Sequence, residues 1–280
     1  MDRVLIIGAT GNIGRELAPI IHRKSVRLRV VSRSLEKLSR FPVGIERVAC
    51  DLNDASAIRS MVAGVDKIFT LAMPGEPESL RRLVDAAASA QVRQVVLISS
   101  TAPDDMIIGQ QHRISENILT SSGLPWTILR PGSLMSNALW WRQTIQAGRA
   151  VYSAVAHVKQ ASISPLDVAK AAAISLSDSA RLGMTYTLKG TRSLSDSDKT
   201  AILSRVLNRL VSCVDAPLEA VIEGMKNRGV PEAEVFKLAE AFAKIIELGD
   251  ETPNDELEQL LGEKPQSFEE WCLQHVEEFR

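Results

Sequence analysis

The sequence predicts an α/β fold: a doubly wound parallel sheet with a smaller, mostly helical lobe in the C-terminal third of the chain. Short apolar runs alternate with helical patterns through the first half, and helical patterns alone follow from about residue 190. A length of 280 residues is enough for one large core and a smaller lobe beside it.

Six apolar, β-branched runs are the expected strands. They lie at residues 4–7, 28–31, 45–50, 67–72, 94–99 and 126–130. The stretches between them carry helix signals, such as Asn53 or Asp54 before residues 55–63 with Gly64 as the stop. This alternation indicates βαβ crossovers, and therefore a parallel sheet with helices on both faces.

The chain is expected to divide into two regions. Residues 1–150 form the cofactor-binding domain, with further contributions from about 160–190, and residues 191–280 form the mainly helical lobe on the substrate side. A strand is expected at residues 184–189. The final helical pattern places Phe268, Cys272, Val276 and Phe279 on one face.

Composition excludes several classes of protein. Hydrophobic residues make up 45% and charged residues 24%, and the formal net charge is −1, which is not typical of a nucleic-acid surface, a polybasic membrane patch or a disordered tail. The three cysteines are far apart and form no CxxC motif, so neither a disulfide framework nor a metal site is expected. The N-terminal apolar run is too short for a signal peptide, and a cytoplasmic protein is expected.

Residues 8–14, GATGNIG, follow the first expected strand and precede a helix. In a dinucleotide-binding Rossmann unit, Gly8 allows the turn out of the strand, Gly11 lets the backbone approach the pyrophosphate, and Gly14 lets the helix pack on the sheet. The residues between them complete the expected cofactor loop: Thr10, Asn12 and Ile13. A helix starting near Asn12 would direct N–H groups at the phosphates. The alternative is a tight turn without a ligand, or a site that has decayed.

The end of the second strand indicates which dinucleotide is bound. An acidic residue there would bind a ribose 2′-hydroxyl, but the chain has Ser32 and Arg33, which favours NADP(H) over NAD(H). Lys37, one helical turn on, is a second candidate for the phosphate, although both cations also suit a solvated surface. Asp51 and Leu52, after the third strand, are expected near the adenine, unless Asp51 only caps the next helix.

Three segments carry a resemblance to a known family: GATGNIG, HRISENILTSSGLPWTILRPGSLMSN and SPLDVAKAAAISL. With them the chain resembles the NmrA-like family of atypical short-chain dehydrogenases. The resemblance implies a Rossmann fold that binds NADP(H), with substrate between the sheet edge and the helical lobe. It implies less about chemistry, because the family includes quinone, azo-compound and isoflavone-type reductases and also regulators that bind the dinucleotide without reducing anything.

The usual short-chain dehydrogenase pair, Tyr-x-x-x-Lys, is missing. Tyr152 and Tyr186 are followed four residues later by Ala156 and Gly190, so an alcohol–ketone mechanism of that kind is not expected.

The segment HRISE offers a different candidate. His112 and Glu116 lie at i and i+4, where a carboxylate can orient an imidazole, and the pattern is similar to the His-x-x-x-Glu of quinone-reductase-like members. His112 is therefore a candidate catalytic residue. The alternatives are a structural histidine and a surface ion pair between Glu116 and Arg113.

Loops after the fourth, fifth and sixth strands are expected to surround the nicotinamide, because parallel sheets bind ligands beyond the carboxyl ends of their strands. These loops supply Ala72, Met73, Pro74, Ser99, Ser100 and Pro131. Ser99 and Ser100 would hydrogen-bond the ring or the substrate, which makes Ser100 a candidate catalytic residue, although serines of this kind also cap loops.

An apolar, aromatic substrate pocket is expected from Met135, Trp140 and Trp141. Residues 137–148 are predicted to form a helix in which the two tryptophans point about 100° apart. The tryptophans suit a core or an oligomer contact equally well.

Two functions remain open from the sequence. The first is an NADPH-dependent oxidoreductase that transfers hydride to an apolar conjugated acceptor such as a quinone; the second is a non-catalytic NADP(H)-binding redox sensor. The expected partner is a small apolar molecule, with neither nucleic acid nor membrane, and a homodimer is left open.

Overall fold

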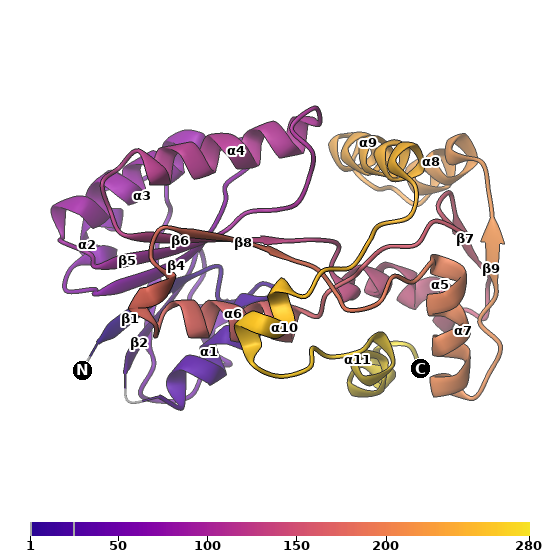
Figure 1. Ribbon diagram of the computed structural model, residues 1–280, viewed down its shortest axis with the longest axis horizontal. Coiled ribbons are helices and arrows are strands. Elements are labelled where there is room, and N and C mark those ends of the chain that lie inside the picture. Colours follow the sequence, from indigo (N-terminus) through magenta and orange to yellow (C-terminus); the bar gives the residue numbers. More distant parts are fainter. Residues whose placement is uncertain (1, 25) are drawn as a thin grey trace. The chain divides into compact units, whose positions relative to one another are not determined.

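The computed structural model describes residues 2–24 and 26–280, and it confirms the predicted α/β fold. All six strands expected in the first half are present, and the strand expected at residues 184–189 joins them in one parallel sheet (Figure 1). The strands are β1 (Arg3–Ile7), β2 (Arg27–Ser32), β3 (Glu46–Ala49), β4 (Lys67–Leu71), β5 (Gln94–Ile98), β6 (Trp126–Pro131) and β8 (Met184–Leu188).

The order of the strands across this sheet is β3-β2-β1-β4-β5-β6-β8. β1 pairs with β2 on one side and β4 on the other, all in parallel. The chain therefore winds in opposite directions from β1. A crevice opens beyond the carboxyl ends of the strands at such a switch point, and open α/β sheets bind their ligands there.

Helices cover both faces of the sheet (Figure 1). On one face lie α1 (Gly14–His22) and α6 (Pro165–Ser175), and on the other α2 (Ala55–Val62), α3 (Pro77–Ser89) and α4 (Ile107–Thr120). Asp54 is the residue that starts α2, because its carboxylate accepts from the N–H groups of Ser56 and Ala57 at 2.8 and 3.1 Å. Two short 3-10 helices, η1 (Glu36–Leu38) and η3 (Ser179–Arg181), complete this part of the chain.

The core on the α2–α4 face consists of strand residues packed on helix residues. Leu5, Ile68 and Leu97 of the sheet are fully buried against Leu80 of α3 and Leu119 of α4. Their burial fixes the strand ends, and the strand ends place the loops that matter for function.

The described chain separates into two compact units. The first holds the seven-stranded sheet and comprises residues 2–24, 26–131, 165–188 and 259–263; the second comprises residues 132–164, 189–258 and 264–280. The domain boundaries expected from the sequence, and the substrate-side role of the helical lobe, stay predictions.

The second unit is mainly helical. Its elements are η2 (Met135–Trp141), α5 (Arg142–Gln146), β7 (Val151–Ser153), α7 (Asp196–Leu207), β9 (Cys213–Asp215), α8 (Leu218–Asn227), α9 (Glu232–Leu248), α11 (Phe268–Gln274) and η4 (Val276–Glu278). α10 (Glu256–Leu261) spans the boundary between the units in sequence. Phe268, Cys272 and Phe279 are buried as expected, together with Trp271, which stacks on Phe268 with ring centroids 5.6 Å apart.

The helix predicted over residues 137–148 is different in the structure. A 3-10 helix over Met135–Trp141 comes first, and only Arg142–Gln146 is α-helical. The two tryptophans still diverge, because a 3-10 helix turns by about 120° per residue. Trp140 is 62% exposed, whereas Trp141 packs on the core of the second unit.

Two further findings bear on the class of protein. Within residues 2–24 and 26–280, no helix combines the length and the apolar character needed to cross a membrane. Cys50, Cys213 and Cys272 are free thiols.

Candidate functional site

The glycine loop folds back on itself between β1 and α1. Gly8 has a φ of +77°, a conformation that a side chain would strain, and its carbonyl accepts from the Gly11 N–H at 3.0 Å. A Cβ on Gly14 would lie 2.2 Å from the Gly8 oxygen and 2.8 Å from the Ala9 Cα. Gly8 and Gly14 are therefore required by the path of the backbone.

The helix after this loop begins slightly later than the sequence indicated. α1 starts at Gly14, and its N-cap residue, Ile13, makes no side-chain capping hydrogen bond. A helix N-terminus carries partial positive charge and N–H groups that suit a phosphate.

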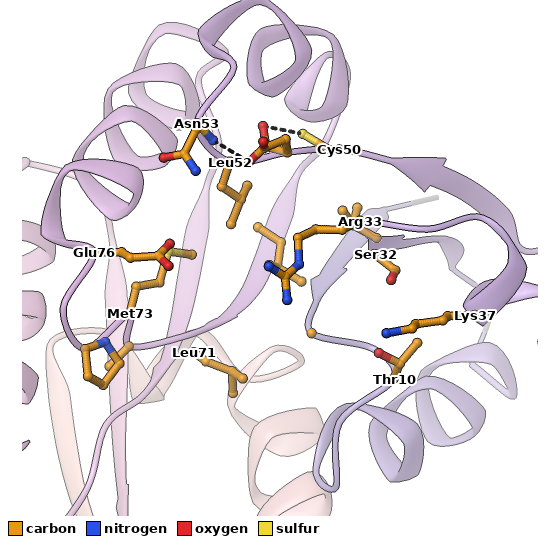
Figure 2. Close-up of a pocket in the computed structure, with 16 residues that line it drawn as sticks. Thr10, Ser32, Arg33, Lys37, Cys50, Leu52, Asn53, Leu71, Met73 and Glu76 are labelled. Carbon is orange, nitrogen blue, oxygen red and sulfur yellow. Dashed lines mark hydrogen bonds between the residues drawn. The ribbon is translucent and has the colours of Figure 1, made fainter. Parts of the chain in front are cut away.

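A pocket of about 430 Å³ opens beside the glycine loop, beyond the carboxyl ends of β1, β2, β3 and β4 (Figure 2). Nine of the predicted cofactor residues line it: Gly8, Thr10, Arg33, Lys37, Asp51, Leu52, Ala72, Met73 and Pro74. The sheet thus brings together residues that lie more than sixty positions apart in the sequence.

The remaining predicted cofactor residues are not part of this pocket lining, and their contact with a cofactor stays a prediction. Gly11, Asn12, Ile13 and Gly14 belong to the glycine loop and the start of α1. Ser99 follows β5 and Pro131 ends β6. The backbone hydrogen bonds between β5 and β6 continue past these strand ends: the Ser99 N–H donates to the Leu129 oxygen at 2.8 Å, and the Thr101 N–H donates to the Pro131 oxygen at 3.2 Å.

Two cations project into the pocket from the segment after β2 (Figure 2). Within the described chain, neither Arg33 nor Lys37 has a hydrogen-bond or ion-pair partner. Arg40, on the same segment, donates to the Thr10 oxygen at 3.1 Å and so ties this segment to the glycine loop. Neither cation is therefore ion-paired within the described chain, although the pocket lining also holds the carboxylates of Asp51 and Glu76.

Asp51 does not cap α2, since Asp54 does so. Its carboxylate accepts instead from the Asn53 N–H at 3.0 Å, within the pocket lining. Asp51 is exposed, so its oxygens remain accessible to a ligand.

Several lining residues were not predicted to bind the cofactor: Ile7, Val31, Cys50, Asn53, Leu71 and Glu76. Each lies at a strand end or in the loop that follows one. The rule that parallel strands gather their carboxyl ends at one edge would have found them.

A second polar group lies beside the ends of β5 and β6. Glu116 of α4 is 5% exposed, and its carboxylate accepts from Ser99 Oγ at 2.5 Å, from Arg130 Nε at 2.9 Å and from Arg113. Burial alone would raise the pKa of the Glu116 carboxyl, but the hydrogen bonds from Arg130, Ser99 and Arg113 outweigh it and lower that pKa. Glu116 is therefore a buried, paired carboxylate.

His112 is not oriented by Glu116, because the carboxylate is occupied by the two arginines and the serine. His112 Nδ1 is buried and has no hydrogen-bond partner in the part of the chain that the structure describes. Burial, with a further contribution from the Arg113 cation, lowers the pKa of His112 from its usual 6.5 to about 4. At neutral pH the imidazole is uncharged, and its catalytic role stays a prediction.

The predicted substrate residues belong to the second unit. Met135 is 5% exposed and packs in the core of that unit, as Trp141 does in part, while Trp140 is exposed. Their contact with a substrate stays a prediction.

The first group of residues fits a dinucleotide. A loop in which Gly8 and Gly14 leave no room for a side chain, a helix N-terminus directly after it, and two cations without an ion pair in the described chain suit a bound pyrophosphate and a further phosphate. The neighbouring Asp51 carboxylate is of the type that accepts from hydroxyl or amino groups of an adenosine.

Comparison with known proteins agrees with this geometry. Residues 8–179 match the model of a family described as NAD(P)H-binding. A (4-alkanoyl-5-oxo-2,5-dihydrofuran-3-yl)methyl phosphate reductase from Streptomyces griseus is 30% identical over 99% of both chains. An NAD(P)H azoreductase from Xenophilus azovorans is 27% identical, again over 99% of both. The solved structure of the NADPH-dependent quinone oxidoreductase QOR2 from Escherichia coli, complexed with NADPH, superimposes with a TM-score of 0.86 at 23% identity, covering 98% of this chain and 99% of the other.

Proposed function

Because the chain belongs to the NAD(P)H-binding family of NmrA-like atypical reductases, we propose that it is an NADPH-dependent oxidoreductase acting on an apolar, conjugated acceptor such as a quinone. The pocket beside the glycine loop, with the unpaired side chains of Arg33 and Lys37, is the observation that carries this proposal.

Preference for NADPH over NADH follows from charge. Two unpaired cations at the end of β2 suit the 2′-phosphate, and no carboxylate stands at Ser32 or Arg33 to accept from a 2′-hydroxyl. Arg40 holds the segment that carries both cations against Thr10. Because this segment is already fixed in the free protein, less conformational entropy is lost when a phosphate binds, and this favours binding.

The missing Tyr-x-x-x-Lys pair and the uncharged imidazole of His112 favour a conjugated acceptor. When bound, NADPH supplies a hydride from the nicotinamide, and the protein must orient the acceptor and the ring. The chain has no Tyr-x-x-x-Lys pair, and His112 is uncharged at neutral pH, which suits acceptors that need little help from an acid. The reductase relatives are named for a dihydrofuranone that carries a methyl phosphate group and for azo compounds, and both classes are conjugated.

Oxidation of NADPH and NADH is the direct test. It is followed spectroscopically with a panel of quinones, azo dyes and conjugated dihydrofuranones, and the affinity for each dinucleotide is measured in parallel. We expect turnover with NADPH and at least one acceptor class. Tight NADPH binding without turnover on any acceptor would leave the redox sensor as the function, since a complete dinucleotide pocket serves both.

Setting and assembly follow from the same proposal. A reductase of small apolar molecules, with three free thiols, suits the cytoplasm. Trp140, 62% exposed, is the side chain to examine for a homodimer contact, because large exposed aromatic residues are enriched at interfaces.

A further inference from the structure

Helix α4 holds the loop that follows β5, residues 99–106, at several points. Arg113 Nη2 donates to the Ser100 carbonyl at 2.6 Å, and Arg113 Nε donates to Asp104 at 3.0 Å. A Cβ on Gly109 would lie 1.8 Å from the Pro103 oxygen, so the backbone of α4 packs directly on this loop. One arginine side chain thus binds the loop at its beginning and near its end.

The position of Arg113 is itself fixed. Its guanidinium pairs with Glu116, one turn along the helix, and Glu116 also pairs with Arg130 of β6, whose Nη2 lies 2.5 Å from Glu116 Oε2. The side chain of Arg113 is only 19% exposed. Water therefore competes poorly for the contacts of Arg113 with Glu116 and with the Ser100 carbonyl, but reaches Asp104, which is 77% exposed. The shared Glu116 carboxylate joins α4 to the ends of both strands.

The loop lies where the reacting end of a dinucleotide is expected. In a doubly wound sheet, a dinucleotide lies across the switch point, and the pocket beside β2 and β3 takes its adenosine end. The nicotinamide end then lies beyond β4, β5 and β6. Ser99 and Ser100 are the first two residues beyond β5.

The two serines differ in what their hydroxyls can do. Ser99 Oγ donates to Glu116. Ser100 Oγ accepts from the Ala102 N–H at 3.3 Å, and within residues 2–24 and 26–280 no acceptor takes its hydroxyl proton. Ser100 is therefore the serine that can donate to a ligand, and Arg113 holds its carbonyl.

We propose that Arg113 is a positioning residue: fixed by Glu116, it holds the Ser100 backbone so that the Ser100 hydroxyl is directed at the carboxamide of the nicotinamide or at the acceptor. This inference rests on the proposed function. The His-x-x-x-Glu spacing indicated that α4 contributes a histidine oriented by Glu116, whereas this proposal assigns α4 the role of fixing the loop after β5. Glu116 acts on the loop through Arg113, and not on His112.

Hydrogen exchange tests the contact without any need for turnover. In the full chain with Arg113→Met, amides of residues 99–106 should exchange at least about tenfold faster than in the wild type, because local opening costs less. Arg113→Lys should lie between the two, since one ammonium cannot reproduce the two bonds of the guanidinium. Arg81→Met is the matched control, because Arg81 lies on the exposed surface of α3 and makes only an exposed ion pair with Glu78. Equal exchange in Arg113→Met and wild type would overturn the proposal.

Kinetics then test the role in positioning. Arg113→Met should lower kcat by about tenfold to a hundredfold, the usual cost of a misplaced group, with the NADPH dissociation constant within about twofold. Ser100→Ala should lower kcat and leave the exchange of the loop amides other than Ala102 unchanged, since only the Ala102 N–H donates to Ser100 Oγ in the described chain. The double variant should be no slower than the slower single one. A kcat in Arg113→Met equal to that of Arg81→Met, or additive losses in the double variant, would contradict the proposal.

The two proposals fail in different ways. If the wild type reduces no acceptor, the proposed function fails, while faster exchange in Arg113→Met together with a loss of nicotinamide contact in Ser100→Ala, read from the fluorescence of bound NADPH, would still support the positioning role. Should Arg113→Met fail to fold, Arg113→Lys and Ser100→Ala carry the same comparison.

Discussion

Arg33 and Lys37 beside β2, and Arg113 and Arg130 beside β5 and β6, are pairs of cations at one edge of the same sheet. Within the described chain, carboxylates pair only with the second two cations: Glu116 with both of them, and Asp104 with Arg113. The first pair has no partner in the described chain. The difference indicates that the first region, with Arg33 and Lys37 at the end of β2, is suited to bind an anion. The second region, with Glu116, Arg113 and Arg130 at the ends of β5 and β6, is suited to fix the loop that follows β5.

Gly14→Ala should have the largest effect, because it distorts the glycine loop beside the pocket in which the dinucleotide is expected to bind. The new Cβ would meet backbone atoms of Gly8 and Ala9, which cannot move without reshaping the loop. We expect the affinity for both NADPH and NADH to fall by about 100-fold or more, which is about 2.7 kcal/mol. Titration calorimetry measures it.

The control for this variant is Gly224→Ala in α8. No atom lies within 4 Å of the Cβ position at Gly224, so the substitution should leave binding unchanged and stabilise the helix by up to about 1 kcal/mol. Unchanged binding in Gly14→Ala would show that the glycine loop does not hold the dinucleotide.

Glu116→Ala should destabilise the second region, in which Glu116 pairs with Arg113 and Arg130. It leaves two guanidinium groups near a buried site without their shared carboxylate, and removal of one partner from such a pair costs about 3 kcal/mol, less where Arg130 reaches water. Chemical denaturation measures the loss of unfolding free energy. Glu78→Ala, at an exposed pair on α3, should change it by less than about 0.5 kcal/mol, and a similar loss in both variants would contradict the prediction.

Arg33→Ala should separate the two dinucleotides. A charged hydrogen bond contributes about 1.5 to 3 kcal/mol, so the affinity for NADPH should fall about tenfold to a hundredfold while that for NADH stays nearly the same. Lys37→Ala should act in the same direction with a smaller loss. Arg81→Ala is the control on the exposed surface of α3, and an equal loss of both dinucleotides in Arg33→Ala would mean that Arg33 is structural.

His112→Gln should have the smallest effect, visible in the pH dependence of stability. The folded protein keeps His112 uncharged down to about pH 4, whereas an unfolded chain protonates it near pH 6.5. The unfolded state therefore binds more protons between these values, and the wild type loses stability as the pH falls through this window. The loss should be smaller in His112→Gln, by about 1 kcal/mol at most for a half-buried group. Parallel curves for the two proteins from pH 7 to pH 4 would show that His112 is already accessible to water.

Much of the pocket beside the glycine loop could be predicted from the sequence, because it depends on patterns that are local in the chain. The glycine spacing, the strand before it and the helix after it are contiguous in the chain, and Arg33 stands where the second strand ends. Nine predicted residues therefore line the observed pocket. Asn53 and Glu76 were missed because their side chains carry no motif and matter only through the edge that the strands share.

The sequence by itself determined the fold class, the six strands of the first half and the loop that fits a dinucleotide, since periodicity and glycine spacing reflect short-range sterics and burial. Only the tertiary structure decided what Glu116 does. The i, i+4 spacing placed it within reach of His112, but folding brings Ser99 of β5 and Arg130 of β6 to the same carboxylate. A buried carboxylate takes the strongest donors available, and two guanidinium groups and a hydroxyl outcompete a neutral imidazole.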